Sequence, residues 1–244
     1  MKIYKLTLMA ALLGFFACNT EHTTEMDSVN EHNNIQQKAT YNLEEILDGM
    51  RAWENIRSNE TTLLQLFNNN NSLQLDMSLF PQGVPLHAYA CLLDGELKFA
   101  VISEVYDRAD YHSELGAYIE VIDAVYTDIA PLANQTYVDY TFQLPTQYIQ
   151  SADALNRIQD WDANYSSWLS NNVPVYQSFH IPTYSLSAQS YTAYFGLKYN
   201  SDDQIDKVAD LVLKTEAGLF FDTIMTQPPF PSNDVGKFYL RTLM

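Results

Sequence analysis

The densest group of ionisable side chains follows a predicted β-hairpin and comprises Asp107, Asp110, His112 and Glu114. Carboxylate oxygens suit calcium or manganese and imidazole nitrogens suit zinc, so a loop that carries both can hold a divalent cation. The spacing matches no established ligand motif. It also fits a solvated loop in which Asp110 or Ser113 forms a turn. A metal-dependent hydrolase built on these four residues, with His87 or His180 beside them, is therefore the alternative function.

A thiol nucleophile is not indicated. His87 and Cys91 fall on one face of one predicted strand, and four residues separate them by about 13 Å, too far for a nucleophile and its base. Nothing in the sequence supports pairing Cys91 with His112 or His180. Cys91 lies in the apolar run 89–93, which is typical of a small buried hydrophobic residue.

Other catalytic and cofactor motifs are missing from the sequence. The acidic run 200–206 lacks the ligand spacing and the central glycine of a calcium loop, and it fits the start of a helix. There is no nucleophile elbow, zinc-protease helix, phosphate-binding loop or dinucleotide fingerprint. We therefore assign no catalytic residue and no cofactor from the sequence, and a non-enzymatic protein is the leading expectation.

Aromatic residues are abundant, with 17 tyrosines, 12 phenylalanines and three tryptophans. Most of them, including all three tryptophans, fall on predicted core positions. Five are placed less clearly and mark a candidate ligand groove: Tyr184, Tyr191, Tyr194, Phe230 and Tyr239. Tyrosine anchors binding surfaces, so such a groove would suit a neutral glycan or a protein partner.

The N-terminus predicts export. Lys2 and Lys5 precede an apolar run from Leu6 to Ala17, which is too short to span a bilayer. The last residues before and including Cys18 resemble the lipobox of bacterial lipoproteins, although Phe15 replaces the usual leucine. The resemblance implies that residues 1–17 are a signal peptide, that Cys18 is acylated, and that the protein is anchored at the outer membrane, on its periplasmic or surface face.

Charge limits the partners. The formal net charge is −17, and removal of Lys2 and Lys5 with the signal peptide would make it −19. Such a surface repels nucleic acid and anionic lipid headgroups, so membrane contact should come from the lipid anchor alone. Residues 18–40 are polar and predict a disordered tether. Residues 41–244 predict a single globular domain.

The domain alternates helix-like and strand-like segments, which predicts an α+β fold with an antiparallel or mixed sheet and about three helices packed on it. Predicted helices begin at Asn42, whose capping-box partner is Glu45, and at Ser151 and Ser201. The first predicted helix ends at Ile56, and its apolar pattern resumes at Leu63–Phe67. The second ends at about Ser170, and the third ends just before Gly218. Predicted strands cover 86–93, 96–106, 117–127, 137–144, 175–181, 191–199, 219–225 and 238–243. The segment 117–127 also fits a helix, and 228–231 predicts an extended loop.

One hairpin has a predicted register. Asp94-Gly95 favours a two-residue type I′ turn, which places His87 opposite Ile102 and Cys91 opposite Lys98. The other face is wholly apolar and should lie on the core. Its residues are Ala88, Ala90, Leu92, Leu97, Phe99 and Val101.

The lipobox, the acidic Asn-rich tether and the aromatic-rich domain together resemble the lipoproteins of Bacteroidetes-type bacteria. The resemblance implies O-glycosylation at Asp-Ser/Thr followed by an aliphatic residue, a pattern met at Ser28 and Thr223, of which Ser28 is expected to be the more accessible. It implies no activity. The sequence thus predicts an envelope lipoprotein that binds a glycan or a protein partner, with a structural subunit of a surface complex as a further option.

Overall fold

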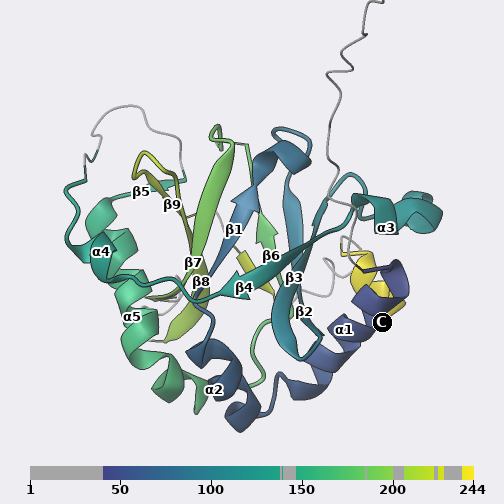
Figure 1. Cartoon of the computed structure of the whole chain (residues 1–244), viewed down its shortest axis with the longest axis horizontal. Coiled ribbons are helices and arrows are strands. Elements are labelled where there is room, and N and C mark those ends of the chain that lie inside the picture. Colours follow the sequence, from purple (N-terminus) through teal and green to yellow (C-terminus); the bar gives the residue numbers. More distant parts are fainter. Residues whose placement is uncertain are drawn as a thin grey trace, which may run out of the picture. The chain divides into compact units, whose positions relative to one another are not determined.

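The computed structural model describes residues 41–137, 139, 147–184, 186–199, 206–222, 225–227 and 238–244. These residues form an α+β fold around a curled antiparallel sheet (Figure 1). The spatial order of the strands is β10-β6-β2-β3-β4-β1-β7-β8-β9-β5, and every described pair is antiparallel. Their bounds are β1 (Ser72–Asp76), β2 (Leu86–Leu93), β3 (Glu96–Ser103), β4 (Glu120–Val125), β5 (Tyr148–Ile149), β6 (Ser178–Ile181), β7 (Ser190–Tyr199), β8 (Lys207–Lys214), β9 (Phe220–Asp222) and β10 (Met225–Gln227).

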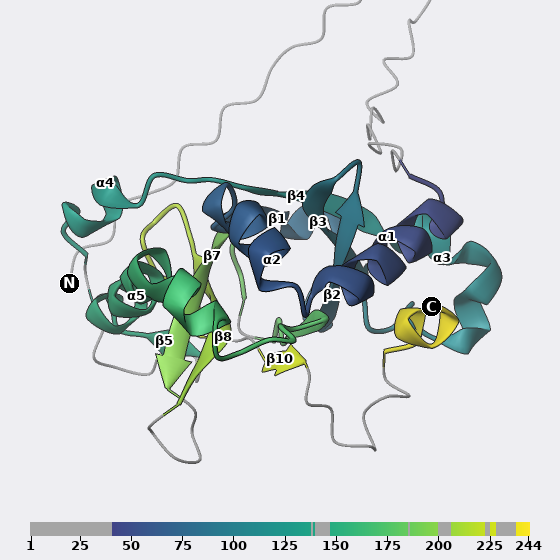
Figure 2. The same cartoon turned by 90° about the horizontal axis from the view of Figure 1, so that it is seen from below.

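Five α-helices lie in the described part of the chain, rather than about three. They are α1 (Leu43–Ile56), α2 (Glu60–Asn68), α3 (Leu115–Tyr118), α4 (Ala130–Ala133) and α5 (Ser151–Leu169). Three short 3-10 helices accompany them: η1 (Met77–Leu79), η2 (Ala109–Glu114) and η4 (Leu240–Leu243). Figure 2 shows α5, α2 and α1 following one another along one side of the sheet. No helix of the described residues is long and apolar enough to cross a bilayer.

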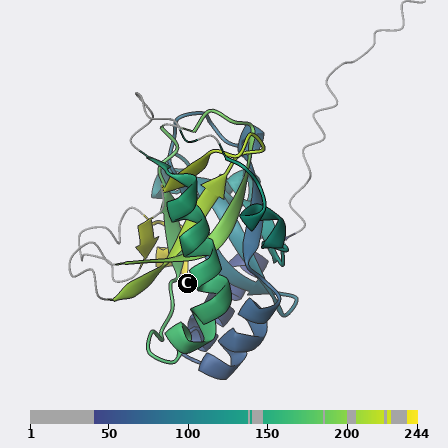
Figure 3. The same cartoon turned by 90° about the vertical axis from the view of Figure 1, so that its left-hand side faces the viewer.

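The starts of the long helices follow from local side chains. Asn42 accepts a hydrogen bond from the Glu45 amide at 3.0 Å, and the Glu45 carboxylate accepts one from the Asn42 amide at 2.7 Å. This capping box confirms the predicted start of α1. At α5, Asp139 accepts hydrogen bonds from both the amide and the hydroxyl of Ser151. The green helix α5 then runs across β7 and β8 (Figure 3).

The predicted hairpin is confirmed. Cys91 pairs with Lys98, and His87 pairs with Ile102. Asp94 and Gly95 both have positive φ, at 54° and 79°, as a type I′ turn requires. The strand β3 ends at Ser103, three residues before the predicted end.

Both faces of this hairpin are buried, whereas the sequence predicted one. The expected face, with Ala90 and Phe99, joins the main core, which also contains Trp53, Phe67 and Trp161. The opposite face joins a second core, which contains Ile46, Met50, Tyr89, Cys91, Ile102, Leu115 and Leu240. The helix α1 packs against β2 and contributes to both cores, with Trp53 in the main core and Ile46 and Met50 in the second.

Two predicted elements are wrong. Residues 207–214 form β8 instead of the third helix, because both faces of this strand are covered: Ala209 and Leu211 lie in the main core, and Val212 packs on the other side against α5 residues. Residues 240–243 form η4 instead of a strand, because the Leu240 amide donates to a side chain and not to a neighbouring strand.

Other boundaries also move. The predicted strand 117–127 is correct over Glu120–Val125, which form β4, while residues 117 and 118 belong to the end of α3. The helical alternative is wrong for the rest of the segment. The predicted strand 175–181 is ordered as β6 over its last four residues. The strand β1 was not predicted, although Leu73 and Leu75 alternate with Gln74 and Asp76. Residues 138 and 140–144, the start 201–205 of the third predicted helix, and the loop 228–231 lie outside the described residues.

Candidate metal centre

Three neighbouring strands bring two histidines and a glutamate together at one end of the sheet. His87 on β2 is the direct register partner of His180 on β6. Glu104 follows β3, on the other side of β2, and its amide continues the pairing by donating to the Pro85 carbonyl at 2.9 Å. Because His87 pairs with Ile102, Glu104 lies two residues further along the same strand face.

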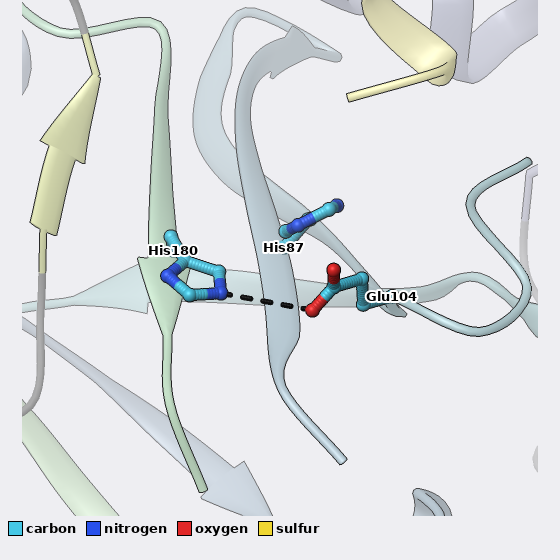
Figure 4. Close-up of side chains that lie close together, drawn as sticks. All are labelled: His87, Glu104 and His180. Carbon is cyan, nitrogen blue, oxygen red and sulfur yellow. Dashed lines mark ion pairs between the residues drawn. The ribbon is translucent and has the colours of Figure 1, made fainter. Parts of the chain in front are cut away.

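The three side chains are close enough to share one ion. One ligand atom from each lies within 4.8 Å of the other two, and His180 Nε2 lies 3.8 Å from a Glu104 oxygen. Figure 4 shows His180 and Glu104 pointing toward one another, with the His87 ring beside them. Ligand atoms around a tetrahedral zinc lie about 3.4 Å apart, so small side-chain rotations would complete the site.

Burial is graded across the centre. The His87 side chain is 1% exposed, His180 21% and Glu104 39%. The cluster therefore has one buried side chain, His87, and one side chain that reaches solvent, Glu104. This arrangement gives an ion a path of entry from the Glu104 side.

Asp107 supports the inner ligand. Its Oδ2 lies 2.6 Å from His87 Nδ1 and also accepts a short hydrogen bond from the Tyr89 hydroxyl. Burial and the charge of Asp107 raise the pKa of Tyr89 well above its ordinary value, so this hydroxyl keeps its proton and remains a donor. Because Asp107 engages Nδ1 of His87, Nε2 is the ring nitrogen that remains for a metal ion. A carboxylate that orients a metal-binding histidine in this way is a common feature of metal sites.

The C-terminal segment completes the surroundings of His87. The Phe238 ring stacks on the His87 ring, with centroids 4.1 Å apart and planes 26° apart. The Leu240 amide donates to the second oxygen of Asp107, Oδ1, at 2.9 Å. Asp107 therefore accepts hydrogen bonds from three groups: a histidine ring, a tyrosine and the C-terminal backbone.

The predicted metal residues are directed to different partners. Asp107 turns inward to His87. Asp110 and Glu114 stay on the surface, where Asp110 lies 3.6 Å from Arg108 and Glu114 accepts a hydrogen bond from Tyr118. His112 contacts the Tyr239 hydroxyl at 3.2 Å. Across the described residues, the group with metal-ligand geometry is His87, Glu104 and His180, and none of the four predicted residues belongs to it.

The predicted groove residues do not share a surface. Tyr191 is 1% exposed in the main core, and Tyr194 is 5% exposed in the cluster under α5. Tyr184 is 69% exposed, and Tyr239 lies in the C-terminal segment beside His112. Phe230 lies outside the described residues, as do Cys18, Ser28 and Thr223.

Cys91 is a buried thiol, and burial raises its pKa to about 12. It stays protonated at neutral pH, which agrees with the structural role expected for it.

Glu104 is the member of this cluster that the sequence analysis missed. The hairpin register placed Ile102 opposite His87, so the same register would have placed Glu104 near that histidine. No local sequence pattern predicts that His180 lies beside His87. Their proximity depends on pairing between β2 and β6, and the two residues are 93 positions apart in the sequence (180 minus 87).

No protein-family model, no curated protein and no solved structure matches this chain.

Proposed function

We propose that this chain is a cell-envelope lipoprotein whose globular domain binds one divalent transition-metal ion, with zinc as the best fit. The observation that carries the proposal is the cluster of His87, Glu104 and His180, with Asp107 orienting the buried histidine. Two imidazoles and one carboxylate suit zinc and other transition metals better than calcium or magnesium, which prefer all-oxygen sites.

Three protein ligands leave at least one coordination position for water or for a group from another molecule. We propose that this position serves binding, so that the metal holds a protein or glycan partner at the envelope. The anchor would be the acyl group on Cys18, and the tether 18–40 would connect it to the domain. Mass spectrometry of the native chain tests this part, since an unmodified Cys18 or a retained Met1 would contradict anchoring.

A metal-dependent hydrolase is the second candidate, because two histidines and a glutamate with an open position also occur in catalytic zinc sites. Hydrolysis needs a base for the metal-bound water. Asp107 already accepts three hydrogen bonds and is poorly placed to take that proton. The described geometry therefore favours binding over catalysis.

The test is a zinc titration of the full-length chain against a chromophoric chelator. Glu104→Gln and His180→Gln remove one ligand each with little change in volume. His112→Gln and Glu114→Gln are matched controls, since they change the same residue types in the loop that the sequence first suggested. We expect one zinc per chain, lost in the first pair and kept in the second. Stoichiometric binding that survives the first pair and fails in the second would move the site to the loop, and no binding to the parent chain would end the proposal.

A further inference from the structure

We propose that the C-terminal segment Phe238–Met244 is a positioning element for the metal centre, so that docking of this segment and binding of the metal strengthen one another. This inference rests on the proposed function, because it concerns regulation of the same site. Its basis is that one short segment contacts both the buried ligand and the carboxylate that orients it.

The segment completes the hydrogen bonding of Asp107. His87 and Tyr89 share Oδ2, and the Leu240 amide holds Oδ1. All three donors are buried, so loss of the Leu240 amide would leave a buried carboxylate oxygen without its protein donor. Such a loss costs free energy unless water replaces the amide or the carboxylate turns, and a turn of the carboxylate would break its hydrogen bond with the His87 ring.

The segment also fixes the plane of the ligand ring. Phe238 is 3% exposed and stacks on His87, while the Tyr89 ring meets His87 edge-on with centroids 6.2 Å apart. These contacts restrict rotation of the His87 ring about its side-chain bonds. A ring held in one orientation presents Nε2 to the metal without a further loss of conformational entropy on binding.

Docking of the segment depends on tertiary contacts. Its regular structure is the single 3-10 turn η4, and short helices are not stable alone. Phe238 and Leu240 bury their side chains in the second core, and the Arg51 guanidinium donates to the Leu243 carbonyl at 3.1 Å. These contacts should form and break together, because one short segment makes all of them. A segment with two such states, docked and undocked, can couple its own docking to metal binding at His87.

Coupling of this kind is reciprocal, so it predicts two independent effects. Weakening the docked segment should weaken metal binding. Metal binding should in turn protect the segment, and the hydrogen-bonded Leu240 amide reports this directly by hydrogen exchange. Zinc binding also stabilises the whole domain and slows exchange of every amide that opens by global unfolding. With a purely structural role for Phe238, zinc would therefore protect Leu240 no more than it protects amides of the central strand β7.

The experiment compares Phe238→Leu, Phe238→Ala and Tyr239→Phe in the full-length chain. Phe238→Leu keeps apolar volume and loses the stack, and Tyr239→Phe removes a hydroxyl that contacts His112 and neither His87 nor Asp107. We expect Phe238→Ala to weaken zinc binding about tenfold and Phe238→Leu to weaken it less, with Tyr239→Phe unchanged. Zinc should slow exchange of the Leu240 amide in the parent chain more than it slows exchange of the β7 amides.

The outcomes separate the two proposals. If the parent chain binds no zinc, both the metal function and this inference fail. If the parent chain binds zinc, the inference fails alone in either of two cases. Folded Phe238→Leu and Phe238→Ala bind zinc as tightly as the parent chain, or zinc protects Leu240 no more than the amides of β7.

Discussion

Asp107 Oδ2 lies 2.6 Å from His87 Nδ1, and both side chains are buried. The pair joins the end of the hairpin to the C-terminal segment, because Leu240 donates to the same carboxylate. A buried imidazole with one nitrogen fixed in this way offers the other to a ligand.

Asp107→Asn should weaken zinc binding by about 10- to 100-fold, the usual effect of losing a carboxylate behind a histidine ligand. The amide retains the size of the side chain but loses the charge that favours Nδ1–H. A competition titration measures the affinity, and nitrogen NMR of His87 reports the tautomer. Unchanged affinity together with an unchanged tautomer would show that Asp107 has no orienting role.

Stability should fall as the pH rises above about 9. Burial raises the pKa of Cys91 to about 12 and raises that of Tyr176, so in the folded state both groups keep protons that the unfolded chain releases. Each such group lowers the free energy of unfolding by about 1.4 kcal/mol per pH unit, from its unfolded pKa up to its folded one. Urea unfolding at pH 8 to 11 measures the slope.

Single substitutions separate the contributions of Cys91 and Tyr176 to the pH dependence of stability. Cys91→Ala should flatten the curve from about pH 9, where the unfolded thiol begins to ionise, and Tyr176→Phe should flatten it from about pH 10. The Tyr176 hydroxyl is buried and makes no hydrogen bond within the described residues, so Tyr176→Phe should cost little at neutral pH. If the free energy of unfolding of the parent chain does not change with pH up to about 11, the raised pKa values of Cys91 and Tyr176 are contradicted.

The ion network between β7, β8, β9 and α5 should be strongly coupled. Lys198 lies 3.0 Å from buried Asp210 and 2.9 Å from Asp222, and Arg157 contacts both carboxylates. Burial and the charge of Asp222 raise the pKa of Asp210. The pKa of Asp222 is lowered because Lys198 and Arg157 outweigh its own burial. Lys198→Met should therefore cost about 3 kcal/mol, since it leaves two carboxylates beside one guanidinium.

Asp210→Asn should rescue Lys198→Met, since it removes the carboxylate that the mutation leaves poorly compensated. A double-mutant cycle by urea unfolding at pH 7 measures the rescue. The cost of Lys198→Met should also shrink as the pH falls, because Asp210, with its raised pKa, takes up a proton first. Additive effects of the two substitutions would contradict coupling.

Close packing of α1 against the hairpin should make Gly49 intolerant of a side chain. A Cβ atom there would lie 2.7 Å from Leu93 Cδ2 and 3.2 Å from the Leu92 carbonyl oxygen. Gly49→Ala gains helix propensity of up to about 1 kcal/mol, but overpacking costs about 1–3 kcal/mol, so a net loss is expected.

Gly116→Ala is the matched control, because a Cβ atom at that helical glycine would meet Leu43 at an ordinary 3.5 Å. Thermal unfolding of the two variants measures the difference. Equal stability of the two variants would show that α1 has room to move away from β2.

Local signals predicted much of the fold. The capping pair of Asn42 and Glu45 located α1, and Asp94-Gly95 fixed the hairpin and its register. Both rest on interactions between residues close in sequence. The second predicted helix, from Ser151 to about Ser170, was likewise correct, since α5 covers Ser151–Leu169.

Packing between segments far apart in sequence explains most of the wrong predictions. β8 is buried on both faces, so its apolar residues do not alternate and also fit a helix at Val208, Ala209 and Val212. For the second face of the hairpin the sequence predicted burial only at Cys91, and no local signal showed that α1 and the C-terminal segment cover the whole face. The candidate metal centre was missed for the same reason, because its three residues come from strands that meet only in the folded sheet.

The measurement that tests the central claim most directly is anomalous diffraction at the zinc edge from crystals of the full-length chain grown with zinc. The account predicts one strong peak between His87 Nε2, His180 and Glu104, with Asp107 still bound to His87 Nδ1. A peak among Asp110, His112 and Glu114 instead, or no peak at the three predicted ligands, would contradict it.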